Sequence, residues 1–192
     1  MKITMTGTDF NRIMRVCIPA LSKDDVREEL RHIDIQCNGE GEGCATALDG
    51  YTLAQTRFAC QGPRCRFHIP PHKKVRNDCT IEITLEDEKI SVSDGVETVT
   101  RPAYHGQQID HAAICKGAQT KKKRATIAFD GRLLMRALKS HAGPYKEPVF
   151  LEIYGPNDAA ILHTVNTCGM VLPMRIEPKE GTPVFWDMRE NA

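Results

Sequence analysis

The sequence contains no hydrophobic run long enough to cross a membrane. A membrane-spanning helix needs about 18 or more consecutive apolar residues, and no such run occurs in this chain of 192 residues. The first residues, MKITMTGTDF, also lack the continuous apolar core of a secretory signal peptide. We therefore expect a cytoplasmic protein with no membrane partner.

Net charge is almost absent as well, because 26 lysines and arginines are balanced by 25 aspartates and glutamates to give a formal charge of +1. A chain with this balance does not bind nucleic acid through its bulk charge. Any nucleic-acid surface must therefore come from basic residues that gather locally.

Motifs that carry common enzyme chemistry are missing. The chain has no GxxxxGK[ST] phosphate loop, no GxSxG nucleophile turn and no HExxH metal motif. Its seven histidines form no recognisable acid–base arrangement. Asp49 could serve as a catalytic carboxylate, but its neighbour Gly50 favours a role in a turn. We expect a protein that is not an enzyme and needs no cofactor.

The eight cysteines could form a disulfide framework in a secreted protein. Several of them instead lie within strand-like or helix-like patterns, where cysteine acts as a small buried hydrophobe: Cys17, Cys37, Cys79 and Cys168. A cytoplasmic protein keeps such thiols reduced, so we predict no disulfide framework.

The chain does contain a recurring order of strand, helix and three strands. Residues 2–6 alternate as a strand, and Thr8 is placed to cap a helix with an apolar face formed by Phe10, Ile13, Met14 and Cys17. Pro19 should end this helix. Strands are predicted at 32–37, 44–48 and 52–58, with the glycine-rich NGEGEG as a hairpin loop between the first two.

The same order recurs twice more along the chain. The second copy has a strand at 66–69, a short basic helical turn within 70–76, and strands at 80–86, 89–93 and 96–101. Residues 103–124 are polar and end in a lysine run, which is typical of a linker. The third copy has a strand at 125–129, a helix at 130–140, and strands at 149–154, 159–165 and 169–176.

Two distant stretches carry the most distinctive residues, ALDGYTLA at 47–54 and VLPMRI at 171–176. An Asp-Gly pair between two extended runs indicates a turn that glycine's permissive φ makes cheap. Such a turn pushes Tyr51 and Leu53 out at the strand ends, where side chains can form the wall of a pocket. The alternative is that both stretches are strand ends that pack against their own core.

These stretches bear a family resemblance. ALDGYTLA resembles the ATDGHRLA-type segment in the middle domain of bacterial sliding clamps, the β subunits of DNA polymerase III, and VLPMRI resembles the MPMRL-type sequence with which those clamps end. FHIPPHKKV, YHGQQIDH and FDGRLLMRALKS are similar to further clamp segments, in the family's order.

The resemblance implies an α+β fold of repeated βαβββ units of the DNA-clamp type, with one full clamp-like domain plus a half domain. Residues 1–111 would be the clamp-like domain with two βαβββ units, and 112–123 a basic linker. Residues 124–177 would be a clamp-like half domain with one βαβββ unit, followed by a C-terminal tail at 178–192.

The same resemblance implies a non-catalytic, DNA-associated platform that tethers polymerase or repair proteins through short linear peptides, and that assembles as a homo-oligomer. The peptide-binding cleft would be formed by Leu48, Gly50, Tyr51, Thr52, Leu53, Leu172, Pro173, Met174, Arg175 and Ile176. Leu48 stands where clamps often have threonine, and Thr52 where they often have arginine.

Clamps turn basic helix faces towards double-stranded DNA and contact its phosphates without regard to sequence. The residues that would face DNA here are Arg12, Arg15, Lys73, Lys74, Arg76, Arg132, Arg136 and Lys139. The alternative is that these cations form ordinary solvated helix faces.

One further string has metal-ligand spacing. Cys60, Cys65, His68 and His72 form a C-x4-C-x2-H-x3-H pattern whose side chains could close a tetrahedral zinc site. The rival to the platform function is accordingly a degenerate clamp that acts as a regulatory or competitor module, in one version dependent on zinc at these residues.

Overall fold

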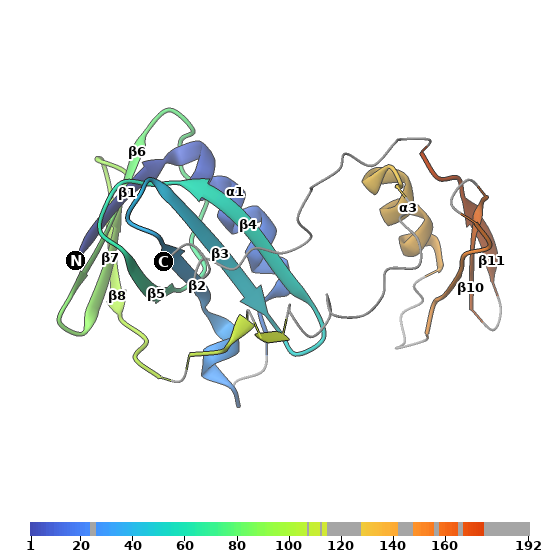
Figure 1. Ribbon diagram of the computed structural model, residues 1–192, viewed down its shortest axis with the longest axis horizontal. Coiled ribbons are helices and arrows are strands. Elements are labelled where there is room, and N and C mark those ends of the chain that lie inside the picture. Colours follow the sequence, from blue (N-terminus) through green and yellow to red (C-terminus); the bar gives the residue numbers. More distant parts are fainter. Residues whose placement is uncertain are drawn as a thin grey trace. The chain divides into compact units, whose positions relative to one another are not determined.

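The computed structural model describes residues 1–23, 26–106, 108–111, 113–114, 128–141, 148–155, 158–164 and 167–174. These residues form two compact units (Figure 1). The first unit contains the described residues from Met1 to Ile114, and the second unit contains those from Ala128 to Met174. Each unit has its own cluster of buried apolar side chains.

The first unit consists mainly of strands. Its described elements are, in chain order, β1 (Lys2–Thr6), α1 (Gly7–Cys17), the 3-10 turns Ile18–Ala20 and Glu28–Arg31, β2 (Ile33–Cys37), β3 (Glu42–Leu48), β4 (Leu53–Ala59), β5 (Cys65–Ile69), β6 (Thr80–Glu86), β7 (Lys89–Ser93) and β8 (Thr98–Pro102).

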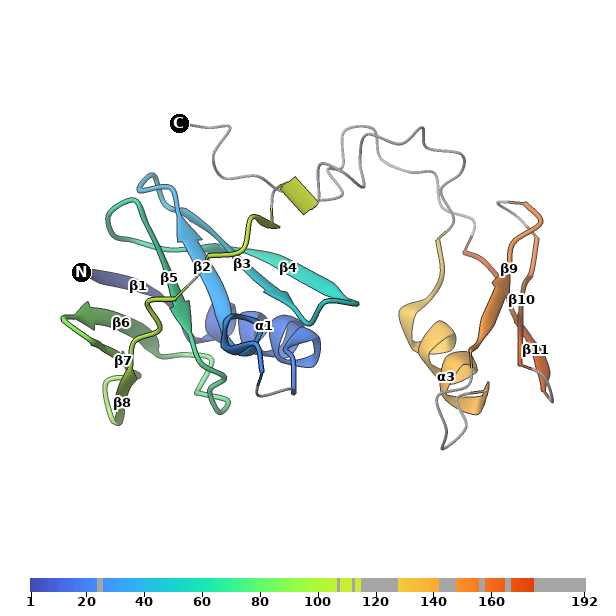
Figure 2. The same cartoon turned by 90° about the horizontal axis from the view of Figure 1, so that it is seen from below.

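These strands form two four-stranded antiparallel sheets, with the orders β1-β6-β7-β8 and β4-β3-β2-β5. The first unit has two halves, β1 to β4 with α1 and β5 to β8. Each sheet contains the last three strands of one half and the first strand of the other, because β1 pairs with β6 and β5 pairs with β2. Figure 2 shows α1 lying against the β4-β3-β2-β5 sheet. Neither half of the first unit therefore completes a sheet by itself.

The core follows from the periodicities of the helix and the strands. The four apolar residues predicted on one face of α1, Phe10, Ile13, Met14 and Cys17, are all buried with exposures of 4% or less. Alternate residues of β2 face the same core, so that Ile33 and Ile35 are fully buried. Residues between them, such as Asp34, point to the opposite face of the sheet.

The second unit is smaller. It contains α3 (Gly131–His141), β9 (Phe150–Glu152), β10 (Ala160–His163) and β11 (Cys168–Val171), and its antiparallel sheet has the order β11-β10-β9. Its buried cluster comprises Ala160, Leu162 and Val171, against which Leu134 and Ala137 of α3 pack. Ala128, before α3, forms an isolated bridge with Met174.

The predicted α+β fold is confirmed, with most described strand ends within two residues of their predicted positions. The last strand, predicted at 169–176, ends at Val171. One local prediction was wrong at the first helix. Thr6, not Thr8, is the N-cap, and its hydroxyl oxygen accepts a hydrogen bond from the backbone N–H of Asp9. The α-helix ends at Cys17, before Pro19, as predicted, and Pro19 lies in the 3-10 turn Ile18–Ala20 that follows.

The predicted helical turn at 70–76 is absent, so the second half of the first unit consists of strands without a helix. Two physical causes act together. Pro70 and Pro71 lack N–H groups, and a proline keeps the residue before it extended. In addition, the N–H and C=O of Val75 are both hydrogen-bonded to the side chain of Asn11, so they are not free for a helical ladder.

No helix within the described ranges combines the length and the apolar character needed to cross a lipid bilayer.

Candidate nucleic-acid interface

An open groove of about 750 Å³ runs between α1 and the segment that follows β5. Because this segment is extended, it leaves one side of α1 uncovered. The groove is lined by Thr8, Asn11, Arg12, Met14, Arg15, Ile18, Pro19, His72, Lys74 and Asn77. The structure thus brings together three of the predicted DNA-facing cations, Arg12, Arg15 and Lys74, at one site.

Asn11 holds the second wall of the groove in place. Its amide nitrogen donates to the carbonyl of Val75 at 2.8 Å and to Oδ1 of Asn77 at 2.7 Å, and its amide oxygen accepts from the N–H of Val75 at 2.9 Å. The backbone N–H of Gly7 donates to the carbonyl of Cys79 at 2.8 Å. Sequence reasoning missed Asn11, because an amide on the polar side of a helix has no periodic signal.

The cations at the groove differ in how they are held. Arg12 is half-buried, and its guanidinium contacts the carboxylate of Asp9 and donates to the carbonyl of Arg57. Arg15 and Lys74 are exposed and form no ion pair with any residue that the structure describes. Their charges are therefore available to an anion.

Lys73 and Arg76 are also exposed, but each has an acidic partner. Nζ of Lys73 lies 2.6 Å from Oε2 of Glu97, and the guanidinium of Arg76 lies 2.8 Å from Oδ2 of Asp78. Exposed pairs of this kind contribute little to stability, yet they partly neutralise the cation. These two residues are therefore weaker candidates for phosphate contacts than Arg15 and Lys74.

The remaining predicted cations lie on α3 in the second unit. Arg132, Arg136 and Lys139 are all exposed, and Arg132 is 3.6 Å from the carboxylate of Asp130, which precedes the helix. The helix is amphipathic, since Leu134 and Ala137 pack against the cluster of buried side chains in the sheet. Leu138, which follows Ala137, is 39% exposed.

The Asp-Gly turn forms as predicted and presents one set of the predicted cleft residues. Oδ1 of Asp49 accepts hydrogen bonds from the N–H groups of Tyr51 at 2.8 Å and Thr52 at 2.6 Å, and these backbone hydrogen bonds lower the pKa of Asp49. Gly50 has a φ of 94°, which only glycine adopts freely. Tyr51 is 97% exposed, so its ring is free to meet a ligand.

The other set of predicted cleft residues belongs to the second unit. Leu172 and Met174 are 67% and 43% exposed, and Pro173 between them is half-buried. The N–H of Met174 donates to the carbonyl of Ala128 at 2.7 Å, which fixes the backbone of this stretch. Arg175 and Ile176 lie outside the described residues.

The four predicted zinc ligands do not gather at one site, because the two cysteines and the two histidines lie in different surroundings. The residues of β5 alternate between the two faces of its sheet, so that Cys65 and His68, three positions apart, point in opposite directions. Cys65 pairs across the sheet with Cys37, and the thiols of Cys60 and Cys65 both hydrogen-bond with that of Cys37.

The two histidines have other partners. Nε2 of His68 is 3.9 Å from Asp34, and burial lowers the pKa of His68. The ring of His72 packs edge-on against Phe10, and its Nδ1 lies 2.9 Å from the carbonyl of Lys73. Within the described part of the chain, no group of three or more histidine, cysteine or acidic side chains could hold a metal. The zinc prediction failed because sequence spacing takes no account of strand alternation.

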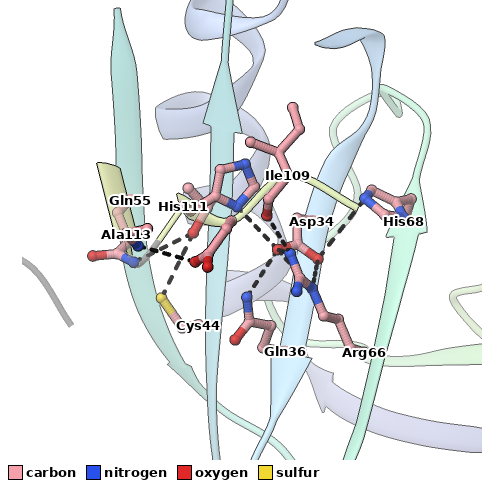
Figure 3. Close-up of polar contacts among 11 residues, drawn as sticks. Asp34, Gln36, Cys44, Gln55, Arg66, His68, Ile109, His111 and Ala113 are labelled. Atoms are coloured by element: carbon pink, nitrogen blue, oxygen red, sulfur yellow. Dashed lines mark hydrogen bonds and ion pairs between the residues drawn. The ribbon is translucent and has the colours of Figure 1, made fainter. Parts of the chain in front are cut away.

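A buried polar cluster centred on Asp34 lies on the outer face of β2 (Figure 3). Arg66 donates from Nε to Oδ1 at 3.0 Å and from Nη2 to Oδ2 at 3.0 Å, and Gln36 donates to Oδ2 at 2.9 Å. Nδ1 of His111 lies 3.1 Å from Oδ2, and Nη2 of Arg66 also donates to the carbonyl of Ile109 at 2.6 Å.

The cluster fixes the segment that leaves the first unit. Burial by itself would raise the pKa of Asp34, but hydrogen bonds from His111, Arg66 and Gln36, together with the charge of Arg66, lower it to about 2. Asp34 is therefore an ionised group with 1% exposure. Such a carboxylate is stable only while its donors stay in place, so it holds residues 109–111 against β2 and β5.

No protein-family model matches the sequence, and a search of curated protein sequences also finds no match. Solved structures do match the fold. A crystal structure of a putative DNA polymerase III β subunit from Eubacterium rectale has a TM-score of 0.73 and 11% identity, covering 90% of this chain and 50% of its own. The DNA polymerase sliding clamp from Bacillus subtilis has a TM-score of 0.72 and 13% identity, with coverages of 90% and 49%.

The DNA polymerase III subunit β from Pseudomonas aeruginosa has a TM-score of 0.65 and 16% identity, covering 92% of this chain and 67% of its own. The chain therefore spans about half the length of the first two clamps and two thirds of the third. At these identities the likeness concerns the fold: the chain has the fold of bacterial DNA polymerase III β sliding clamps.

Proposed function

We propose that the chain acts as a clamp-like platform on double-stranded DNA and tethers polymerase or repair proteins to it. The observation that carries this proposal is the groove beside α1, where Arg15 and Lys74 are exposed and without an acidic partner among the described residues. The clamp fold supports it, because the proteins that share this fold are DNA polymerase sliding clamps.

The chemistry of the groove suits phosphates rather than bases. Exposed arginine and lysine side chains reach phosphate oxygens without reading sequence, and each contact releases a counterion from the DNA. The exposed Arg136 and Lys139 on α3 offer a second surface of the same kind. Binding of this sort keeps a protein on DNA while leaving it free to slide.

The exposed apolar residues near the Asp49 turn and at 172–174 suit the attachment of short peptides. Tyr51, Leu172 and Met174 offer one aromatic and two adaptable aliphatic side chains that remain accessible. A polymerase bound through such a peptide gains effective concentration at the DNA, so a tethering protein needs no catalytic group.

Salt dependence of DNA binding tests the proposal. Each phosphate contact adds about −0.9 to the slope of log K against log salt concentration. Replacing both Arg15 and Lys74 with alanine should therefore make the slope shallower by about 1.8 if both cations contact phosphates. The matched control replaces Lys73 and Arg76, which have acidic partners, and should change the slope less.

The proposal fails if the chain has no affinity for duplex DNA at low salt. It also fails if the double variant at Arg15 and Lys74 has the slope of the unmodified protein. Fluorescence anisotropy with a duplex of random sequence measures both quantities.

A second candidate is a degenerate clamp that competes with another clamp for partners, and the exposed side chains of Tyr51, Leu172 and Met174 favour it. This function requires peptide affinity without DNA affinity, so the same titrations, repeated with a clamp-binding peptide, separate the two candidates.

A further inference from the structure

The first unit reveals a pairing rule between its two halves. In its two sheets, β2, β3 and β4 are joined by β5, while β6, β7 and β8 are joined by β1. Each half thus gives its first strand to the other half and receives one in return. The second strand of each half, β2 or β6, is flanked on both edges as a result.

The described residues of the second unit repeat the first half of this arrangement. The isolated bridge between Thr4 and Gln61 has its counterpart in the bridge between Ala128 and Met174. The helix begins three residues later in both cases, at Gly7 and at Gly131, and both helices have 11 residues. The strands β9, β10 and β11 then correspond to β2, β3 and β4.

The second unit has an open sheet edge where the pairing rule calls for another strand. β9 pairs with β10 on one side, and no described residue pairs with its other edge. The registers make Leu151, opposite Leu162, the counterpart of Ile35, opposite Ala45. Leu151 is 44% exposed, whereas Ile35 is 0% exposed. The strand has an apolar residue suited to a core, and no described strand pairs with the edge beside it.

Helix α3 is also less well covered than its counterpart α1. Leu138 of α3 occupies the position that Met14 occupies in α1, and their exposures are 39% and 4%. Away from the open side the counterparts agree, since Val171 and Phe58 are 4% and 3% exposed. Leu151 and Leu138 therefore lie exposed at positions that the first unit covers with its second half.

We propose that a second copy of this chain covers that side, so that two second units form one complete two-half domain. A half that carries both a strand to give and an edge to receive is complementary to itself. By the pairing rule, β9 of one copy receives the backbone segment at Ala128 of the other, and the exchange is reciprocal. Such a two-fold, isologous interface closes with two copies and leaves no further edge open at β9.

This assembly joins two chains through their second units and leaves both first units outside the interface. Two copies then contain three two-half domains, one from each first unit and one shared. The interface buries Leu151 and Leu138, which are otherwise exposed in an apolar surface of the kind that marks association sites. The inference goes beyond the proposed function and does not depend on DNA binding.

The test is the mass of the full chain in solution, measured by sedimentation velocity over a concentration series without DNA. The unmodified chain should dimerise. The double variant Leu138→Glu, Leu151→Glu should raise the dimer dissociation constant by about a hundredfold or more, because it places carboxylates in an apolar interface.

The matched control is Met170→Glu on β11. Met170 is 68% exposed, and its counterpart Arg57 is exposed in the complete first unit, so this charge should leave the dimer intact. A monomeric unmodified chain overturns the inference, as does a dimer that survives the double variant or dissociates in the control.

Amide hydrogen exchange of the unmodified chain keeps the test valid if the double variant fails to fold. Protection at residues 150–152 should rise with protein concentration, because the open edge of β9 becomes paired in the dimer. Protection that is independent of concentration, over a range in which the mass changes, would place the interface elsewhere and overturn the inference. Neither measurement involves DNA, so failure of the proposed dimer can be distinguished from failure of the proposed platform function.

Discussion

Replacing Asp34 with asparagine should destabilise the first unit strongly, and the loss should depend on pH. The substitution keeps the shape of the side chain but removes the charge that faces Arg66 and accepts hydrogen bonds from His111 and Gln36. Asp34 has 1% exposure, so water cannot compensate for the lost partner.

The pKa of Asp34 sets the magnitude. A fall in the pKa from 3.8 to about 2 means that folding favours the ionised form by about 2.5 kcal/mol, because one pKa unit corresponds to about 1.36 kcal/mol. Leaving Arg66 without its partner adds a cost, although its side chain keeps 27% exposure and some hydration. We expect Asp34→Asn to lose about 2 to 4 kcal/mol of unfolding free energy at neutral pH.

The sign of the pH dependence follows from the lowered pKa. Ionised Asp34 stabilises the fold fully above the pKa of the unfolded chain, near 3.8, and this contribution disappears as the pH falls towards about 2. The difference between the unmodified protein and Asp34→Asn should therefore shrink between about pH 4 and pH 2.

Urea unfolding followed by circular dichroism over this pH range measures the difference. Glu40→Gln, in the exposed loop between β2 and β3, removes a negative charge without disturbing the cluster and should leave the stability nearly unchanged. A loss below about 1 kcal/mol for Asp34→Asn, or a loss that stays constant down to pH 2, would refute the reasoning.

Two further substitutions test the groove and the turn. Gly7→Ala should lower the free energy of unfolding, measured in urea, by about 1 to 3 kcal/mol, because the new Cβ would lie 1.9 Å from the carbonyl oxygen of Arg76. Gly131→Ala, whose Cβ would have nothing within 4 Å, should leave the free energy of unfolding unchanged. Equal losses in the two variants would argue against the close approach at Gly7. Tyr51→Ala should weaken binding of a clamp-binding peptide by about tenfold or more in anisotropy titrations. Val96→Ala is the control, because Val96 lies in a second Asp-Gly turn and is 86% exposed, and this variant should bind the peptide like the unmodified protein. An equal loss of peptide affinity in the two variants would show that the turn at Tyr51 is not part of the peptide site.

The sequence predicted those parts of the fold that depend on local periodicity. The buried face of α1 follows from helical spacing and the alternation of β2 from the strand repeat, and both patterns are visible within about ten residues. The turn at Asp49 and Gly50 was equally predictable, because aspartate accepts hydrogen bonds from the backbone two and three residues on.

Features set by distant contacts were not predictable in this way. His111 meets Asp34 across 77 positions of sequence, and nothing near either residue indicates the other. The extended conformation after β5 depends on Asn11, which lies 64 positions before Val75. For the candidate site, sequence reasoning therefore identified the cations Arg12, Arg15 and Lys74 but not the residue that shapes the groove beside them.

Binding to duplex DNA of random sequence over a salt series tests the central claim most directly. A platform held by phosphate contacts should bind the duplex at low salt and lose affinity as the salt concentration rises, and replacing Arg15 and Lys74 should make that loss shallower. Absence of binding at low salt, or the same salt dependence in the double variant, would contradict the account.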